Sequence, residues 1–399
     1  MATVDTYIDG VNVTQYIQAG QVTHRLNRPT TAEVTFPSLA IPTLTARSRL
    51  RVDLNGTIDF NGTLEGEAAI EVDGAEDPDS VITKAQAIDA LVYMEGRRAM
   101  DADGDYTNPS FMYDFLAGPQ IIQAICNNSL IYTGLFPFSL GTFATGGADI
   151  SGAPTNWPMS ISEVIVLLTE TGECDIEMVP YDSGSSSMMG VLNAYNGNLG
   201  NNLSGSVHFQ FQTGTFNCTQ CRMTVDKSGL ANRIRYLLGP RRMTALDPGS
   251  LQHWDGSIDR TTTAQLPAGW NSVGEPARAQ SEIDYGIRED TRVIDAQGDS
   301  NTLSRELYLY GWSREAWLRL KPKIMVDLTP QPGTLPTFKA GDLIRVSCGP
   351  SFHGGFTGVQ RVMEYTYTWD DMGVVQLGAP AGQAGAAAVT TTAAAEGLL

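Results

Sequence analysis

The chain has 399 residues, of which 42% are hydrophobic, and this is enough for two or three domains with sizeable cores. Its formal net charge of −18, from 44 acidic and 26 basic residues, excludes electrostatic capture of nucleic acid or of an anionic membrane. The sequence has neither a basic and apolar leader nor the roughly 18 consecutive apolar residues of a membrane span. We therefore expect a protein that is made in the cytosol without a signal peptide and does not insert into a membrane.

The first block, residues 1–97, alternates apolar and polar residues in short runs between turn signals, which is typical of β-strands. Arg49 to Gly56 predicts a strand that ends in an Asn-Gly turn. A long strand is predicted from Thr63 to Val72 and a partner strand from Val81 to Ala90. This block predicts a β domain.

The middle block, residues 98–225, differs because helical patterns appear in it. One helix is predicted over Pro119 to Cys126, and a second begins after Ser160 or Ser162, either of which is a suitable N-cap. Strands are predicted at Asp175–Pro180, Val207–Gln212 and Cys221–Val225. The pattern indicates a small α+β domain with long loops.

The third block, residues 226–378, predicts β-strands and one helix that begins near Ser300 and ends before Pro322. The Ala/Gly/Thr-rich tail, residues 379–399, cannot bury enough apolar surface to order itself. We expect this tail to lie along another subunit. The fold class predicted for the whole chain is mainly β, α+β, with two β-barrel or sandwich domains that flank the small α+β domain.

The first and third blocks share an order of features. Arg51-Val52 followed by Phe60-x-Gly62 is matched by Arg345-Val346 followed by Phe356-x-Gly358, and each set precedes a long predicted hairpin. The identity is weak, but the order repeats in two separate blocks. The sequence therefore predicts the same β fold twice, in residues 1–96 and 226–378.

Several segments together resemble the tail hub and minor tail protein family of long-tailed, siphovirus-type bacteriophages. The opening Ile-Asp-Gly-Val-Asn-Val-Thr, residues 8–14, and the later Gly-Asp-Leu-Ile-Arg-Val, residues 341–346, match this family in their order. The likeness also takes in Phe216-Asn217, residues 232–239, Asp284-Tyr-Gly286 and the helix predicted after it. It covers the first and third blocks well and the middle block in outline.

The resemblance implies a virion protein of the tail tip with no enzymatic activity and no cofactor. It implies a homotrimer in which each chain carries two tube-like domains, so that three chains form a pseudo-sixfold ring that caps the sixfold tail tube. The implied partners are the tail tube or distal tail protein, the tape measure protein and tail-tip proteins, and phage DNA passes through without specific binding. Because the sequence stops soon after the second tube-like block, we expect receptor-binding or wall-degrading modules to be separate proteins.

Candidate metal and catalytic residues are few. Cys218-Thr-Gln-Cys221 lacks a second ligand pair for zinc, and a strand rather than a helix follows it, so we expect structural cysteines. Asp101 to Asp105 resembles a calcium loop, but its Gly is fourth and no Glu follows at the twelfth position, which favours a solvated turn. Motifs for nucleophilic or metal-dependent hydrolysis are absent from the sequence.

An acidic stretch is the candidate functional surface. Between Val52 and Thr83 there are no Lys or Arg residues, and four acids share one face of a strand because side chains alternate with period two. An ordinary solvated face is one interpretation, and a channel wall that repels the DNA backbone is the other. The candidate channel-lining residues are Glu65, Glu67, Glu71 and Asp73.

Three alternatives to a hub remain open at this point. A hexameric distal tail ring protein would carry one tube-like domain per chain. A tail-tip cell-wall hydrolase would need a pair of carboxylates that folding brings together, which leaves no spacing in the sequence. A host-binding adhesin would be expected to show exposed aromatic clusters or repeats.

Overall fold

The structure is a computed structural model, and it describes residues 3–37, 44–45, 48–64, 69–72, 81–99, 117–134, 136–145, 160–170, 174–182, 188–197, 199–214, 216–238, 279–294, 319–349 and 356–378. The predicted helix near Ser300, the acidic turn at Asp101 to Asp105 and the tail 379–399 lie outside these residues. None of the described helices is both long enough and apolar enough to cross a membrane.

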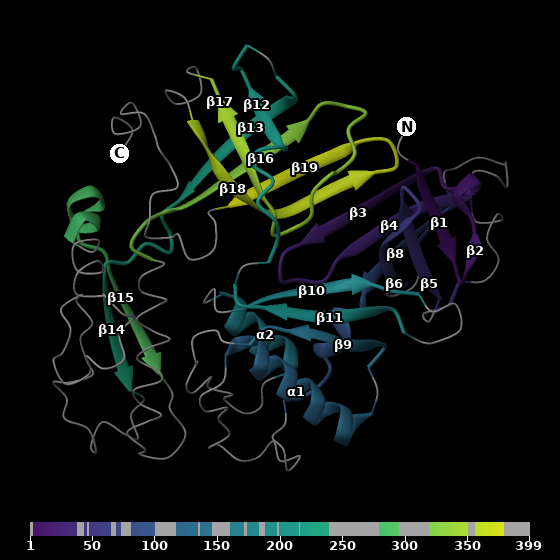
Figure 1. The fold of residues 1–399 in the computed structure, drawn as a ribbon, viewed down its shortest axis with the longest axis horizontal. Helices are drawn as coiled ribbons and strands as arrows, with labels where there is room; N and C mark the ends of the chain where they lie inside the picture. The colour runs from purple at the N-terminus through teal and green to yellow at the C-terminus, as the bar shows by residue number, and fades with distance from the viewer. Residues whose placement is uncertain are drawn as a thin grey trace.

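A sheet of 14 strands dominates the described part of the chain (Figure 1). Its first part, which we call the first β unit, begins near the N-terminus and ends in the 3-10 helix η3, Ala90–Met94. Asn55 and Gly56 have φ of 53° and 76°, which confirms the predicted Asn-Gly turn. The strands of this unit are β1 (Val4–Ile8), β2 (Val11–Asn12), β3 (Ala19–Arg25), β4 (Thr31–Pro37), β5 (Arg49–Leu54), β6 (Thr57–Leu64), β7 (Ala69–Val72) and β8 (Val81–Asp89).

The second part of the same sheet, which we call the second β unit, comes from the later half of the chain. Two of its strands, β12 and β13, lie in the stretch that the sequence grouped with the middle block, but they pair with β17 and β16 of the large sheet. The strands of this unit are β12 (His208–Phe211), β13 (Cys218–Asp226), β16 (Lys323–Pro330), β17 (Leu343–Cys348), β18 (Phe356–Thr368) and β19 (Met372–Gly378).

The two β units have the same strand order. The first follows β3-β4-β8-β6-β5-β1, and the second follows β13-β16-β19-β18-β17-β12. In both units the strands occur in the same chain order, and neighbouring strands are antiparallel except that β12 pairs with β17 in parallel. Each unit also has a long hairpin after its Phe-x-Gly, β6 and β7 with β8 in one and β18 with β19 in the other. The predicted internal repeat is therefore present in strand order, but its second copy begins at β12, residue 208, and not at the predicted residue 226.

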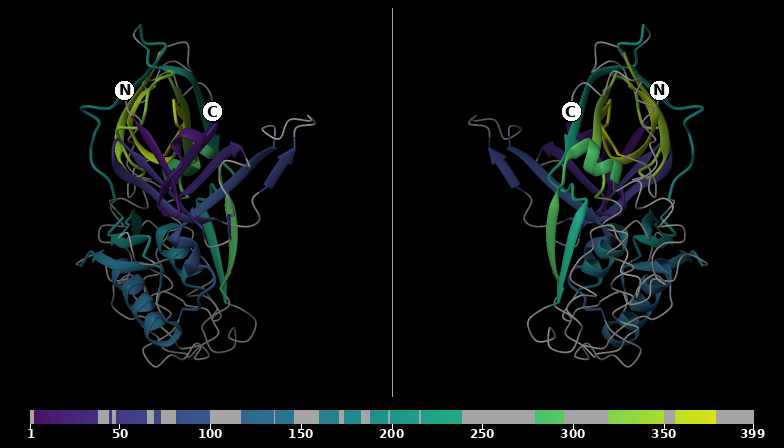
Figure 2. Two further views of the ribbon diagram at one scale, coloured as in Figure 1. Left: turned by 90° about the vertical axis from the view of Figure 1, so that its right-hand side faces the viewer. Right: turned by 90° about the vertical axis from the view of Figure 1, so that its left-hand side faces the viewer.

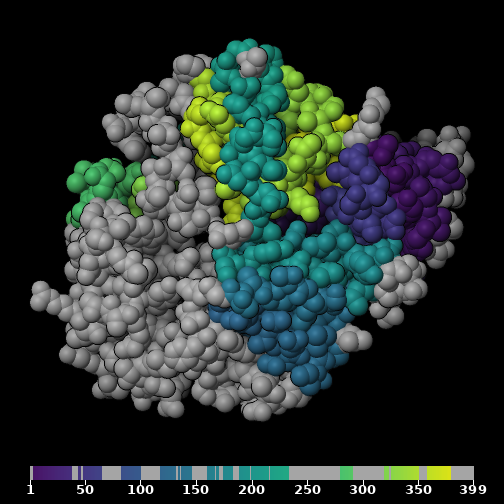
Figure 3. Space-filling model, in the orientation of Figure 1, coloured from purple at the N-terminus to yellow at the C-terminus, as the bar shows by residue number. Residues whose placement is uncertain are grey.

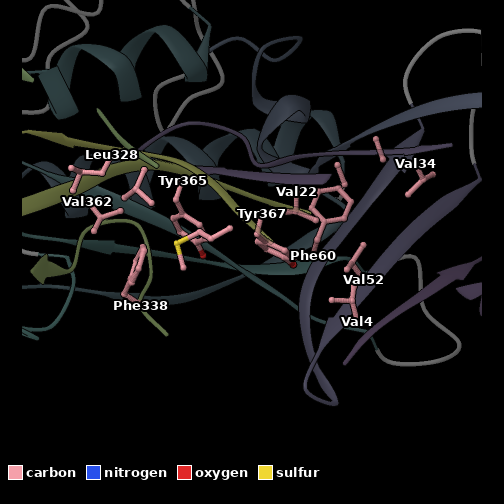
Figure 4. Close-up of a cluster of buried hydrophobic side chains, with 14 of the residues drawn as sticks. Val4, Val22, Val34, Val52, Phe60, Leu328, Phe338, Val362, Tyr365 and Tyr367 are labelled. Carbon is pink, nitrogen blue, oxygen red and sulfur yellow. The ribbon is translucent and has the colours of Figure 1, made fainter. Parts of the chain in front are cut away.

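Alternating side chains of the large sheet build one continuous core (Figure 4). Strand β4 alternates buried and half-buried residues along its whole length, as the period of two requires. Phe60 from the first β unit and Tyr367 from the second are both fully buried in this cluster. Because the core is continuous between the units, each unit buries part of its apolar face against the other.

The middle unit has its own core, formed by α1 and α2 against a small sheet. Ser160 caps α2: its Oγ accepts from the Glu163 N–H, and the Glu163 carboxylate accepts from the Ser160 N–H, as in a capping box. Both predicted helices are confirmed. The elements are α1 (Gly118–Thr133), β9 (Phe138–Phe143), α2 (Ile161–Glu170), β10 (Asp175–Pro180) and β11 (Gly190–Tyr195).

The fold is mainly β with a small α+β part, as the sequence predicts. The described strands form an open sheet rather than closed barrels, since the strand path runs from β13 at one end to β2 at the other. A separate parallel pair is formed by β14 (Arg233–Leu238) and β15 (Glu289–Ile294). Figure 3 shows the first β unit in purple, the middle unit in blue and teal, and the second β unit in teal, green and yellow on one face.

Candidate functional site: the junction of the β units

The two β units meet strand to strand. Residues Gln21–Arg25 of β3 pair antiparallel with Glu364–Thr368 of β18. This is possible because β18 has 13 residues, and β17 covers one of its edges only over Phe356–Arg361. The other half of that edge is left for β3. The contact joins an outer strand of the first unit to an inner strand of the second, so the two surfaces are different.

Side chains along this seam form cross-strand pairs. Thr23 and Thr366 lie opposite each other, with their Oγ1 atoms 2.9 Å apart. Arg25 donates from Nε to the Glu364 carboxylate at 2.9 Å, and these two side chains are 36% and 37% exposed. A pair as exposed as this contributes little, about 0–1 kcal/mol. The main-chain pairing and the core beneath it therefore hold the seam together.

A half-buried polar cluster lies beside the seam. His24 Nε2 is 2.7 Å from Asp59 Oδ2, and the Tyr367 hydroxyl donates to the same oxygen. The His24 ring also stacks on Tyr365, with centroids 4.8 Å apart. Burial raises the pKa of Asp59, but the charge and hydrogen bond of His24 and the hydrogen bond from Tyr367 together lower it below its ordinary value. The cluster thus stabilises an ionised carboxylate between strands of both units.

The middle unit attaches through a buried ion pair. Arg361 of β18 and Asp175 of β10 are 5% and 2% exposed, and Arg361 Nη2 lies 2.6 Å from Asp175 Oδ2. Asp175 also accepts from Asn27 Nδ2 at 2.9 Å, and Asn27 belongs to the turn after β3. One carboxylate therefore connects the first β unit, the middle unit and the second β unit.

The remaining hydrogen bonds of this ion pair are satisfied. Arg361 donates to the carbonyl oxygens of Leu199 and Gly341, and the Leu199 N–H donates to Asp175. Asn27 Oδ1 in turn accepts from the Ile176 N–H at 2.8 Å. Asn27 has φ of 61°, a left-handed conformation that Asn adopts more readily than most residues. A buried pair is tolerated only when it is satisfied in this way.

A second attachment lies at the other end of the middle unit. Arg51 of β5 donates to Asp53 in its own strand and to Asp182 just after β10, the latter at 2.7 Å. Its guanidinium carbon lies 4.3 Å from the centre of the Tyr7 ring. Hydrogen bonds to Asp53 raise the pKa of Arg51 further, against the effect of burial. Asn61 also donates to the Tyr181 carbonyl.

The cysteines of the Cys-x-x-Cys pattern, Cys218 and Cys221, pack in the hydrophobic core. Cys218 is buried, and burial raises the pKa of its thiol to about 12, so it is protonated at neutral pH. Cys221 contacts Cys348 of β17, with the two sulfurs 3.4 Å apart. His208 is hydrogen-bonded to Ser347. Within the part of the chain that the structure describes, no group of three or more His, Cys, Asp or Glu residues could hold a metal ion.

Of the four acidic candidate residues, the structure describes the backbone of one. Glu65, Glu67 and Asp73 lie outside the described residues, and Glu71 lies in β7 with Ile82 of β8 as its partner. The β7 and β8 hairpin extends away from the body of the protein in Figure 2. Their role as a channel wall stays a prediction.

Sequence reasoning did not find the junction residues. His24, Asp59, Asp175 and Arg361 have no local signature, because their partners are 35 to 308 residues away in the chain. The one available signal was the repeated strand pattern, which predicts two units but not how they join.

No model of a protein family matches the sequence, and no curated protein matches it either. Solved structures do match over nearly the whole chain. The 43 kDa tail protein of prophage MuSo2 from Shewanella oneidensis has a TM-score of 0.59 at 12% identity, covering 95% of this chain and 99% of that one. A tail protein from Neisseria meningitidis has a TM-score of 0.54 at 12% identity, covering 94% and 96%. Prophage tail protein gp18 from Listeria monocytogenes has a TM-score of 0.52 at 11% identity, covering 95% of each chain.

These likenesses show the fold, which this chain shares with the three tail proteins over about 95% of its length. At about one residue in eight identical, they do not carry residue roles across. What the chain does must be argued from its own architecture.

Proposed function

We propose that this protein is a structural component of a bacteriophage tail, and that it acts at the tail tip as a hub between a sixfold tube and a threefold tip. The observation that carries the proposal is the duplicated β unit, which gives each chain two copies of one strand order. Three such chains supply six similar units, which is the number that a sixfold tube requires. The fold shared with two prophage tail proteins and a further tail protein agrees with this role.

The way the units meet also supports a ring. The contact is between different surfaces, an outer strand of one unit and an inner strand of the other. Contacts of this head-to-tail kind, when repeated with a rotation, close into rings or continue as filaments. A ring of six units would repeat one seam inside each chain and one between chains.

Two alternatives fit less well. A hexameric distal ring protein would be expected to have one β unit per chain, whereas this chain has two. A hydrolase would need a carboxylate poised for proton transfer. Burial raises the pKa of Asp89 to about 6, but its two oxygens accept from the Thr30 and Leu91 N–H groups, so that it caps η3. Asp59 and Asp175 are held by His24 and Arg361. These carboxylates hold turns and units together, which favours a non-enzymatic role.

The proposal places the protein in the virion tail after synthesis in the host cytoplasm. Its neighbours would be the tail tube or distal tail protein, the tape measure protein and tail-tip proteins. The net charge of −18 suits a channel through which DNA passes without being bound.

Light scattering after size-exclusion chromatography tests the stoichiometry. A trimer of the 43.0 kDa chain has a mass of about 129 kDa. Particles of that mass, with a threefold outline in electron micrographs, are expected. A stable hexamer would favour the distal ring instead, and a monomer at all concentrations would contradict the hub.

A further inference from the structure

The strand edges that lack a partner within the described residues include those of β13 and β7. Strand β13 ends the sheet path and pairs only with β16. Strand β7 pairs only with β8, while β5 pairs with β6 and β1 and not with β7. Unpaired edges recruit other strands, so proteins that assemble use them as contact surfaces.

The repeat shows what these two edges correspond to. By strand order, β13 is the counterpart of β3, and the region of β7 is the counterpart of the second half of β18. Within the chain, β3 and the second half of β18 are the elements that pair to make the seam. Each chain therefore has one seam already formed and the two halves of an equivalent seam still open.

The pairing of the strands fixes the register on the β13 side. We superpose Arg51 of β5 on Arg345 of β17. The residue pairs between neighbouring strands then extend this correspondence from strand to strand across each sheet. Ala87 then corresponds to Leu377, and Ala32 to Val326. Their partners Val22 and Met223 correspond in turn, so Thr23 matches Thr224.

Burial agrees with this register. The register superposes buried residues on buried residues. The residues concerned are Ala87 with Leu377 and Ala32 with Val326, all of which are fully buried. Val22 and Met223 both pack against the same hydrophobic cluster. A register wrong by one residue would place core residues opposite surface residues, because side chains alternate with period two.

The other side of the seam follows in the same way. Val375, the partner of Tyr365, corresponds to Ala85. The ladder of β18 and β19 is irregular between Tyr365 and Tyr367; with Thr366 placed before this irregularity, it corresponds to the partner of Lys84. That partner is Ala69 of β7.

We propose that β13 pairs antiparallel with β7 of a second copy of this chain, with Thr224 opposite Ala69, as the equivalent of Thr23 opposite Thr366. The inference rests on the proposed ring and gives the contact that closes it. In this register Arg222 falls opposite Glu71, two residues of opposite charge. Val225 also fits, since it is 41% exposed in the single chain, and its counterpart His24 stacks on Tyr365 at the seam.

Paired cysteines test the contact directly. The double variant Thr224→Cys with Ala69→Cys should form disulfides between chains under mild oxidation and give covalent dimers and trimers on non-reducing gels. The matched control is Thr23→Cys with Thr366→Cys, whose parent hydroxyls are 2.9 Å apart, and which should form a disulfide within one chain. Peptide mass spectrometry of the linked species identifies the residues, and each single variant should give no link.

A charge exchange provides an independent measurement. Arg222 is exposed, so Arg222→Glu should leave the chain folded but weaken assembly roughly tenfold, and adding Glu71→Arg should restore it.

The outcomes separate the pairing from the proposed ring. A particle of about 129 kDa that forms no cross-link through residues 69 and 224 would contradict the pairing and leave the ring standing. A chain that remains at 43.0 kDa at every concentration would contradict both.

Discussion

The seam between the β units and the attachment of the middle unit hold the protein together in different ways. At the seam, backbone pairing runs along β3 and β18, and the cross-strand ion pair is more than a third exposed. At the attachment, one buried ion pair of Arg361 and Asp175 connects all three units. The first kind of contact can be repeated wherever two strand edges match. The second depends on single side chains and occurs once in each chain.

This difference suits the assembly proposed above. Backbone pairing is almost independent of sequence, so the same contact can form inside the chain and between chains although the two units have diverged. The buried ion pair instead fixes the middle unit in one position, because a charge at this depth tolerates few alternatives.

The largest effect should come from breaking the buried ion pair. Arg361→Met leaves Asp175 buried without its cation and should lower the free energy of unfolding by about 3–5 kcal/mol. Urea denaturation measures this. The double variant Arg361→Met with Asp175→Leu should recover most of the loss, because it removes both charges. Equal losses in the single and double variants would show that the pair is not what holds the attachment.

An intermediate effect is expected from the polar cluster beside the seam. Asp59→Asn removes a charged acceptor from His24 and Tyr367 and should cost about 1.5–3 kcal/mol at pH 7. The folded protein lowers the pKa of Asp59 below its ordinary value of 3.8. Its contribution is therefore complete above that value and is lost as the pH falls through the lower, folded-state pKa.

Acid titration of stability measures this contribution. The difference between the parent and Asp59→Asn should be constant from pH 7 to about 5 and should shrink below about pH 4. A difference that grows on acidification would mean that Asp59 is protonated in the folded protein, contrary to its proposed state.

The smallest effect should come from the exposed pair on the seam. Arg25→Ala should change the free energy of unfolding by less than about 1 kcal/mol, and added salt should reduce the difference further. Denaturation at low and high salt measures both. A loss as large as that of Arg361→Met would mean that side chains rather than backbone pairing hold the seam.

Local patterns in the sequence predicted local structure. Ser160 with Glu163 placed the start of α2, Asn55-Gly56 placed a hairpin turn, and the Phe-x-Gly motifs located the repeat, because each depends on residues close in the chain. The sequence analysis assigned β12 and β13 to the middle block, but they pair with β17 and β16 of the second β unit, because the pattern of a strand does not identify the strand it pairs with. The junction was missed for the same reason, as Arg361 and Asp175 are 186 residues apart.

The symmetry of the assembled particle tests the central claim, that two equivalent β units per chain build one ring. Averaged end-on electron micrographs should show three chains forming six similar lobes, with alternate lobes carrying the middle unit. A particle with six chains and twelve lobes, or three chains whose β units do not lie in one ring, would contradict the account.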